Sequence, residues 1–487
     1  MAAAATVTSR TTPIPGLLVF GLPVHGDQRG WFKENWNRSS MGALGLPDFG
    51  PVQNNISFNA RRGTTRGIHA EPWDKFISLA SGKIFGAWVD LREGPSFGAV
   101  FHCEMTPGDA VFVPRGVGNA FQTLEDNTAY TYLVNDHWSA GAQDEYTFLN
   151  LADPHAAVPW PLPLNQATLS EQDKNHPRLE SVVPVKPRRI LVPGANGQLG
   201  RALREAFADV DYVDFATRDE FDVTDEDAYR SIPWRKYSTI INATAFTGVD
   251  VAETAPGRTA AWRVNAGAVS RLARTAVEHS LTLVHVSSDY VFDGSAEIHT
   301  EDEPPSPLGV YGQSKAAGDT AVAAIPRHYI VRSSWVVGDG PNFVRTMAQL
   351  AERGVRPSVV DDQWGRLTFA ADIAAGIKHL LASGAPYGTY NLSGGGEPKS
   401  WAGIAREVYR LCGSDPDMVV PVSTEQYSKP GTAPRPRNST LALSKIEASG
   451  FVPAPVESRL AGYLMDHATD RTTSFKDSGR IGQRSET

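Results

Sequence analysis

The spacing of hydrophobic and polar positions changes near the middle of the chain. Before about residue 183, short apolar runs alternate with turns rich in Gly, Pro and Ser, and no long helical period appears. This rhythm is typical of strands joined by tight turns, so we predict an all-β first domain, a barrel or jelly roll. The expected strands cover residues 75–79, 84–91, 99–105, 110–113 and 129–134.

In the second half, apolar runs alternate with amphipathic segments of helical period. Such βαβ repetition predicts a parallel, doubly wound sheet of the Rossmann type. Beyond the run that precedes Gly194, we expect strands at 212–215, 239–242, 281–287 and 329–333. The expected helices cover 201–207, 225–232, 259–279, 311–324 and 343–352. Residues 357–450 are expected to form a small substrate-binding subdomain.

These patterns divide the chain into two domains. Residues 1–13 are expected to be a flexible lead-in, and 14–183 form the first domain. A Pro-containing linker at 184–188 leads to the second domain at 189–470. The polar tail at 471–487 is expected to be disordered.

Composition narrows the class of protein. The net charge is −8 and no block of Lys and Arg occurs, so we expect no nucleic-acid partner. No apolar run is long enough for a membrane helix, so we expect no membrane association either. Two distant cysteines, Cys103 and Cys412, offer no disulfide framework, and the N-terminus lacks a signal-peptide core. We therefore expect a cytoplasmic protein.

A glycine-rich loop opens the second domain. Gly194, Gly197 and Gly200 stand at every third position between an apolar run and an amphipathic segment. Such a strand–turn–helix holds a dinucleotide pyrophosphate at the helix N-terminus, although an ordinary strand-to-helix turn is an alternative.

A second pattern in this domain points to carbonyl reduction. Tyr311 and Lys315 are four residues apart, so on a helix they share one face. A neighbouring ammonium lowers the pKa of a phenol, which makes Tyr311 a proton donor. Ser288, just after an expected strand, adds a hydroxyl at the edge of the sheet where ligands bind. Together with the glycine loop, this set is specific for a short-chain dehydrogenase/reductase.

The first domain has a different candidate. Cupin-type barrels often bind a metal through a His-x-His pair and a later histidine, but here these positions hold His69, Glu71 and Asn119. We therefore expect no metal, and His69 remains as an acid–base group.

The first domain resembles the dTDP-4-dehydrorhamnose 3,5-epimerase family from about residue 16 to 184. The resemblance lies in residues 27–34, 53–57, 66–69, 111–116 and 169–173. It implies a cupin-like fold in which His69 is the base, Asp173 orients it, Tyr132 is the opposing acid and Lys75 stabilises the enolate. The positions that it implies for nucleotide-sugar binding are Arg29, Glu34, Gln53, Asn55, Arg66 and Asn119. The chain departs from the family at 70–71, in the short loop between His69 and Lys75, and at Asn119, where the family has histidine.

The second domain resembles dTDP-4-dehydrorhamnose reductase from residue 189 to about 466. The resemblance lies in residues 194–200, 241–250, 287–294, 332–335, 342–344 and 361–366. It implies that NADPH or NADH gives hydride to the C-4 ketone, while Tyr311 protonates the alkoxide, Ser288 hydrogen-bonds to it and Lys315 assists. The implied cofactor-binding residues are Gly194, Asn196, Gly197, Gln198, Leu199, Gly200, Asp222, Val223, Ala243, Ala245, Tyr311 and Lys315. The implied substrate-binding residues are Ser288, Asp289 and Trp335.

The choice of nicotinamide stays open at this point. Asp214 stands about where an acidic residue marks NAD, whereas Arg218 is placed to hold a 2′-phosphate.

The two resemblances together imply a fusion enzyme that makes dTDP-L-rhamnose from a dTDP-sugar, and possible pairing of two copies through the epimerase domain. Two alternatives remain. The departures near His69 admit a different 6-deoxyhexose product, and some reductase-like domains are non-catalytic regulatory subunits, as in methionine adenosyltransferase. The regulatory alternative predicts loss of Tyr311 or Lys315, and the chain retains both.

Overall fold

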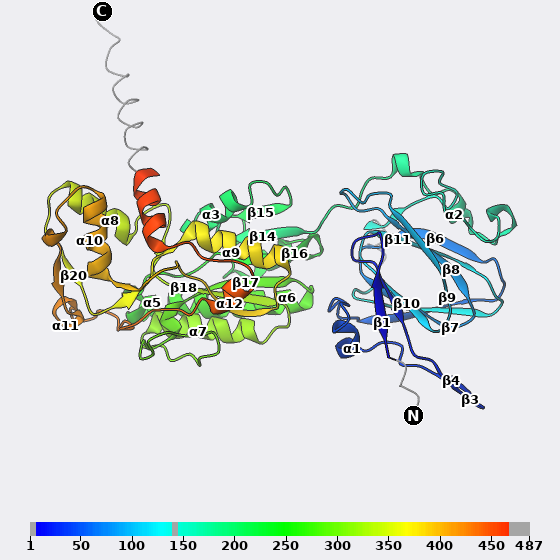
Figure 1. Ribbon diagram of the computed structural model, residues 1–487, viewed down its shortest axis with the longest axis horizontal. Helices are drawn as coiled ribbons and strands as arrows, with labels where there is room; N and C mark the ends of the chain where they lie inside the picture. The colour runs from blue at the N-terminus through cyan, green and yellow to red at the C-terminus, as the bar shows by residue number, and fades with distance from the viewer. Residues whose placement is uncertain (1–5, 139–144, 467–487) are drawn as a thin grey trace, which may run out of the picture. The chain divides into compact units, whose positions relative to one another are not determined.

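The chain folds as two compact units, Met1–Pro187 (unit 1) and Arg188–Thr487 (unit 2). The computed structural model describes residues 6–138 and 145–466 (Figure 1). The predicted tail at 471–487 lies outside these residues. Each unit is described by itself.

Unit 1 consists mainly of antiparallel strands. Its strands are β1 (Thr8–Thr11), β2 (Leu18–Gly21), β3 (His25–Asp27), β4 (Gly30–Phe32), β5 (Gln53–Asn59), β6 (Thr65–Ala70), β7 (Lys75–Ser81), β8 (Ile84–Asp90), β9 (Val100–Met105), β10 (Asp109–Val113), β11 (Val117–Thr123), β12 (Thr128–Val134) and β13 (Thr147–Phe148). Its helices are the short α1 (Arg38–Gly42) and α2 (Glu171–Lys174).

Two antiparallel sheets pack face to face in unit 1. One has the order β1-β2-β10-β7-β12-β5 and the other β13-β6-β11-β8-β9. Alternate residues of both sheets meet in a buried core that includes Ile77, Trp88 and Val111. β3 and β4 form a separate hairpin that projects from the sheets (Figure 1).

One expectation for unit 1 was wrong, and one buried strand was not predicted. Residues 8–11 belong to no flexible lead-in, because they form β1 and pair with β2 along its length. The glycine-containing stretch after Pro114 continues directly into β11, a fully buried strand between β6 and β8. Both strands are held by partners distant in sequence, which a local pattern does not reveal. The five strands expected from the apolar runs are confirmed, with shifted ends.

Unit 2 alternates strands and helices. Its strands are β14 (Arg189–Pro193), β15 (Val213–Ala216), β16 (Tyr237–Asn242), β17 (Thr282–Ser288), β18 (His328–Ser333), β19 (Val336–Val337), β20 (Ser358–Val360), β21 (Trp364–Gly365), β22 (Thr368–Phe369), β23 (Gly388–Asn391), β24 (Lys399–Ser400) and β25 (Val420–Val422). Its helices are α3 (Gln198–Ala206), α4 (Glu226–Ser231), α5 (Ala255–Trp262), α6 (Val269–Glu278), α7 (Val310–Ala323), α8 (Phe343–Glu352), α9 (Ala370–Ser383), α10 (Trp401–Leu411), α11 (Thr424–Tyr427) and α12 (Ser444–Ala448).

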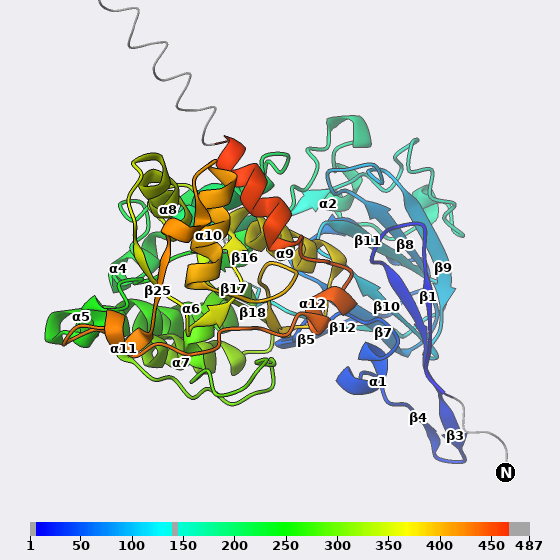
Figure 2. The same cartoon turned by 60° about the vertical axis from the view of Figure 1, so that its left-hand side comes forward.

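A six-stranded parallel sheet, in the order β15-β14-β16-β17-β18-β23, forms the centre of unit 2. Leu272 of α6 and Val322 of α7 belong to the core on one face. Leu203 of α3 and Ile377 of α9 belong to the core on the other. A third core lies between α8 and α10, which are neighbours in both views (Figure 2).

The helix expected at 259–279 is interrupted. α5 begins earlier, at Ala255, and a π-helical segment, Arg263–Ala268, joins it to α6. This segment contains the buried Asn265, whose side chain hydrogen-bonds to both the backbone N–H and the carbonyl of Phe246. A polar anchor of this kind accounts for the extra residue in the turn, since π-bulges reposition single side chains. The helix expected at 343–352 is confirmed as α8.

The predicted linker is shorter than expected. Val185 pairs with the backbone of unit 1, because its N–H donates to the Leu91 carbonyl and its own carbonyl accepts from Glu93. The Lys186 carbonyl also accepts a hydrogen bond from Nη1 of Arg115, so the first half of the predicted linker is attached to unit 1. Across the described ranges, we found no helix with the length and apolarity that spanning a bilayer requires.

Candidate active sites

A cavity of about 600 Å³ in unit 1 contains the predicted acid–base pair. His69 on β6 places its Nε2 2.8 Å from Oδ1 of Asp173 on α2. Ser170 fixes the start of this helix, because its Oγ accepts a hydrogen bond from the backbone N–H of Asp173. Burial is the largest single influence and acts to raise the pKa of Asp173, but the hydrogen bond and charge of His69, with smaller contributions from Ser170 and His176, together lower it. Because an ionised carboxylate only accepts, the proton lies on Nε2 and the lone pair on Nδ1.

Lys75 and Tyr132 line the same cavity. Lys75 is buried rather than solvated, and its Nζ lies 2.5 Å from Oε1 of Glu71 and 5.3 Å from the centre of the Tyr132 ring. Burial, and then the charge of Glu71, raises the pKa of the Tyr132 phenol. In the sequence, Glu71 is a departure from the metal-binding and epimerase patterns, yet in the structure it is the direct partner of the predicted enolate-stabilising lysine.

Two predicted substrate-binding residues, Arg66 and Asn119, also line this cavity. The Nε of Arg66 donates to Oδ1 of Asn59 at 3.1 Å. Asn119 is opposite His69 in the strand register and forms a hydrogen bond with the hydroxyl of Tyr130.

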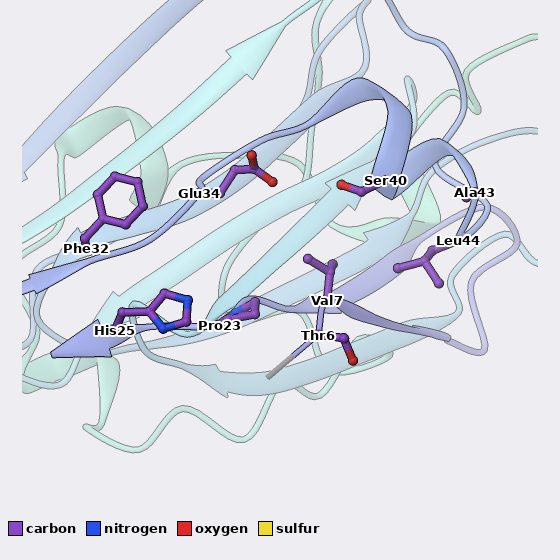
Figure 3. Close-up of a pocket in the computed structure, with 9 residues that line it drawn as sticks. All are labelled: Thr6, Val7, Pro23, His25, Phe32, Glu34, Ser40, Ala43 and Leu44. Carbon is purple, nitrogen blue, oxygen red and sulfur yellow. The ribbon is translucent and has the colours of Figure 1, made fainter. Parts of the chain in front are cut away.

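Four other predicted substrate-binding residues do not line this cavity. Gln53 and Asn55 are hydrogen-bonded to each other on β5, where Asn55 is opposite Tyr132. Arg29 is at the exposed β3–β4 hairpin and pairs with Asp27. Glu34 lines a separate cavity with His25 and Phe32 of the hairpin and Leu44 near α1 (Figure 3).

His176 also lies next to the acid–base pair. Its ring is 5.3 Å from that of His69 and stacks on Phe148 at 4.6 Å. The Gly67 carbonyl faces this ring, and burial, with a further contribution from His69, lowers the pKa of His176. No spacing in the sequence connects His176 with His69, so only the fold identifies it.

In unit 2, two adjoining cavities of about 310 and 530 Å³ share Gly197 and residues 243–245. α3 begins directly after Gly197, and no side chain caps its N-terminus, so its first N–H groups are available to a phosphate. Gly194 has φ +87°, and a Cβ there would approach the backbone of Ala243 to 2.8 Å. Glycine at this position lets the loop pack against Ala243, and the uncapped helix N-terminus suits the charge of a dinucleotide pyrophosphate.

The predicted cofactor residues divide between the two cavities. The smaller is lined by Gly194, Asn196, Asp222 and Val223, the larger by Gln198, Leu199, Tyr311 and Lys315, and both by Gly197, Ala243 and Ala245. Gly200 lines neither, but a Cβ there would lie 2.3 Å from the Gly194 carbonyl, so it permits the helix to pack against the loop.

Tyr311 and Lys315 share one face of α7, next to Ser288 at the end of β17. The pKa of Tyr311 is raised in this structure, so the lowering expected from Lys315 does not prevail. Lys315 Nζ donates to the Val286 carbonyl at 2.7 Å, and burial, followed by the charge of Asp289, raises the pKa of Tyr311. Burial also lowers the pKa of Lys315 to about 8, opposed by Asp319.

Asp289 and Trp335 line the larger cavity with Ser288. Oδ1 of Asp289 accepts a hydrogen bond from the Ser288 hydroxyl at 2.9 Å, and burial raises the pKa of this carboxyl to about 6. Trp335 stacks on Trp401 at 3.8 Å.

The two candidate markers of cofactor choice are placed differently. Asp214 pairs with Arg189 at 2.6 Å and accepts from the Tyr237 hydroxyl, and it lines neither cavity. Arg218 lines the smaller cavity, with its Nε 3.1 Å from Oδ2 of Asp222.

Comparison with known proteins assigns each unit a separate relationship. The family model described as dTDP-4-dehydrorhamnose 3,5-epimerase matches residues 11–181, and the RmlD substrate binding domain model matches residues 188–468. Over 180 residues, 36% of this chain, the sequence is 51% identical to the RmlC homolog of Streptococcus pyogenes serotype M6, of which it covers 90%.

Unit 2 has its own relatives. Over 277 residues, 55% of this chain, the sequence is 36% identical to dTDP-4-dehydrorhamnose reductase of Mycobacterium tuberculosis, of which it covers 89%. The crystal structure of the Bacillus anthracis dTDP-4-dehydrorhamnose reductase in complex with NADP superposes with a TM-score of 0.53 at 32% identity. That match covers 57% of this chain and 99% of the other.

Proposed function

Because the chain belongs to the dTDP-4-dehydrorhamnose 3,5-epimerase family in unit 1 and to the RmlD substrate binding domain family in unit 2, we propose that it is a bifunctional enzyme of dTDP-L-rhamnose synthesis. Unit 1 epimerises dTDP-4-dehydro-6-deoxy-D-glucose at C-3 and C-5, and unit 2 reduces the C-4 ketone. One observation carries this proposal: a single chain holds the His69–Asp173 pair in one cavity and Ser288, Tyr311 and Lys315 in another.

In the epimerisation step, the Nδ1 lone pair of His69 takes a proton from the carbon next to the ketone. The electron pair of the broken C–H bond becomes an enolate, whose charge the Lys75 ammonium stabilises. The Tyr132 hydroxyl then gives its proton to the same carbon from the other face. Asp173 supports this sequence, because its carboxylate holds the His69 proton on Nε2 and stabilises the imidazolium that forms.

In the reduction step, NADPH when bound supplies the hydride to C-4. The Tyr311 hydroxyl gives its proton to the alkoxide oxygen, and the Ser288 hydroxyl donates a hydrogen bond to it. Lys315, buried behind them, places positive charge near the phenolate that remains.

We propose NADPH rather than NADH as the preferred cofactor. Arg218 lines the cavity next to the glycine loop, where its guanidinium supplies charge for a 2′-phosphate. Asp214 supports the same choice, because Arg189 and Tyr237 already occupy its carboxylate and it does not reach the cavity.

We assign the remaining predicted residues to the nucleotide sugar. In unit 1 these are Gln53, Asn55, Arg66 and Asn119, and in unit 2 they are Ser288, Asp289 and Trp335. The finer description of the fold that we favour is a cupin-like jelly roll over 14–183, to which β1 adds residues 8–11, and a doubly wound Rossmann-type domain over 189–470, of which 467–470 lie outside the described residues. The strand orders of the two units support it.

We further propose that unit 1 forms a homodimer. β5 is an edge strand whose Ile56 and Phe58 are 69% and 61% exposed, and Phe32 of the hairpin is 71% exposed. Exposed apolar side chains along an edge strand favour a partner surface. Arg29 and Glu34 lie outside the His69 cavity, so nucleotide binding by these two residues requires the second copy. Sedimentation analysis should give a dimer, and Ile56→Asp should give a monomer.

The cellular setting that we propose is the cytoplasm, without nucleic-acid or membrane partners. Among the described residues Cys103 and Cys412 form no disulfide, which suits a reducing compartment.

The test is incubation of the full chain with the keto sugar and either NADPH or NADH, followed by NMR of the product. We expect the L-rhamno configuration and faster oxidation of NADPH. A product of another configuration would overturn the substrate assignment, and no oxidation of either cofactor would favour the regulatory-subunit alternative.

A further inference from the structure

His176 is next to the acid–base pair of unit 1, yet the epimerisation as proposed gives it no role. Its side chain is 8% exposed, packed against Phe148 and edge-on to His69. Within the described ranges, neither of its ring nitrogens has a hydrogen-bond partner of normal geometry. The Gly67 carbonyl faces the ring and can serve one nitrogen at most. A buried polar group without a partner is costly, so the remaining ring nitrogen beside a reactive centre points to a ligand.

The groups around His176 match one ligand chemistry. Donor atoms of His69, Asp173 and His176 all lie within 4.8 Å of one another. Two imidazoles and one carboxylate are a set that binds Zn²⁺ and related divalent transition ions, with further positions open. Bonds of about 2.0–2.2 Å put two donors of a tetrahedral ion roughly 3.4 Å apart. The three side chains can therefore surround an ion after movements of about 1.5 Å or less.

We propose that His69, Asp173 and His176 form an inhibitory site for a divalent transition-metal ion of the Zn²⁺ class. This site is distinct from the metal position of cupin barrels, which falls on His69, Glu71 and Asn119 in this chain. The ion is a regulator here and takes no part in the epimerisation. The binding of the ion is inferred from the geometry of the three side chains alone, whereas the inhibition rests on the proposed epimerase function of unit 1.

Inhibition follows from the tautomer of His69. A neutral imidazole carries one proton and one lone pair, and in the structure the proton on Nε2 is donated to Asp173. A metal bound through Nε2 takes up a lone pair there, so the ring proton moves to Nδ1. The number of protons on the ring is unchanged, but Nδ1 is now an N–H and cannot take a proton from the sugar carbon. The ion also engages Asp173, which can no longer stabilise an imidazolium.

Binding is tested on the full chain with Co²⁺ alone, followed by its visible absorption. We expect intense bands of a four- or five-coordinate ion at one equivalent, abolished by Zn²⁺. His176→Gln and His176→Phe should remove these bands, the first keeping a polar side chain and the second keeping the stacking on Phe148. His155→Gln is the control, because His155 belongs to the same unit, is largely exposed and lies 3.9 Å from Asp153. Bands that persist in both His176 variants, or are absent from the unaltered chain, overturn the site.

Inhibition is tested by solvent deuterium exchange into the keto sugar at increasing Zn²⁺, with each variant compared with its own rate in chelator. The His176 variants should need at least about tenfold more Zn²⁺, since loss even of an outer-shell partner costs a metal site that much. Equal sensitivity of the variants and the unaltered chain contradicts the proposal. If no exchange occurs without metal, the epimerase assignment fails, while the Co²⁺ spectra still decide whether the ion binds.

Discussion

The two units control proton transfer by different physical means. In unit 1 the reacting groups are held by short contacts with carboxylates, His69 with Asp173 at 2.8 Å and Lys75 with Glu71 at 2.5 Å. In unit 2 the reacting groups are desolvated. Burial raises the pKa of Tyr311. Burial also lowers the pKa of Lys315 to about 8, and the Asp319 carboxylate on the same helix only partly opposes this lowering.

This difference corresponds to the two reactions. Epimerisation moves a proton from one face of a carbon to the other, so the site needs a base on one face, an acid on the other, and groups that stabilise the enolate and the imidazolium between the two transfers. Reduction creates a single alkoxide, and a phenol with a raised pKa keeps its proton until that stronger base appears. The reactivity of the groups in unit 1 therefore depends on their carboxylate partners, whereas the reactivity of the groups in unit 2 depends on the exclusion of water.

The largest expected effect separates the two chemistries. Tyr311→Phe should lower the rate of NADPH oxidation by about 10²–10⁴-fold, because it removes the hydroxyl that protonates the alkoxide. Deuterium exchange into the keto sugar, which depends on unit 1, should keep its rate. His69→Ala is the reciprocal control and should lose exchange but still oxidise NADPH when the epimerised ketone is supplied. Loss of both activities in either variant would contradict two independent sites.

A second variant tests whether pairing supports unit 1. Glu71→Gln leaves the Lys75 ammonium buried without its carboxylate, and breaking a buried pair costs up to about 3–5 kcal/mol. The amide still accepts a hydrogen bond, so we expect a loss of about 1–3 kcal/mol in the unfolding free energy of unit 1, measured by denaturant titration. Glu104→Gln breaks the exposed Lys83–Glu104 pair, which has the same 2.5 Å separation, and should change stability little. Equal losses would mean that burial of the pair is irrelevant.

Sequence alone predicted different parts of the two sites. The helical spacing of Tyr311 and Lys315 and the glycine loop are local patterns, so their positions in unit 2 followed from the residues. The residues did not predict where the Lys315 ammonium points, because it donates a hydrogen bond to the carbonyl of Val286 on β17. In unit 1 the roles of His69 and Asp173 came from resemblance. His176 gave no signal, since it reaches His69 only through the packing of α2 against β6.

The same distinction applies to the fold. Alternating strands and helices in unit 2 and the apolar strands of unit 1 are visible in local hydrophobic patterns. β1 has four exposed residues and no apolar period, and only its pairing with β2 makes it a strand.

The pH dependence of cofactor binding tests desolvation in unit 2. The pKa of Lys315 is lowered to about 8, so its charged form dominates below this pH and is lost as the pH rises through it. If the ammonium contributes to binding, NADPH affinity should fall above about pH 8, approaching tenfold per pH unit. Fluorescence titration of NADPH measures this. Lys315→Met should bind more weakly at pH 7 and lose the dependence, and an unaltered slope in this variant would assign the titration to another group.

The smallest expected effect concerns an exposed charge at the rim of the same desolvated site. Arg218 has a side chain that is 74% exposed, so its interaction with a 2′-phosphate is screened by water and salt. Arg218→Ala should raise the KM for NADPH by about tenfold or less, with little change for NADH, and added salt should narrow the difference between the two cofactors in the unaltered chain. Arg230→Ala is a matched control, because Arg230 is similarly exposed, pairs with Asp227 and lines neither cavity. An equal rise in the KM for NADH would show that Arg218 supports the cofactor-binding loop and does not bind the 2′-phosphate.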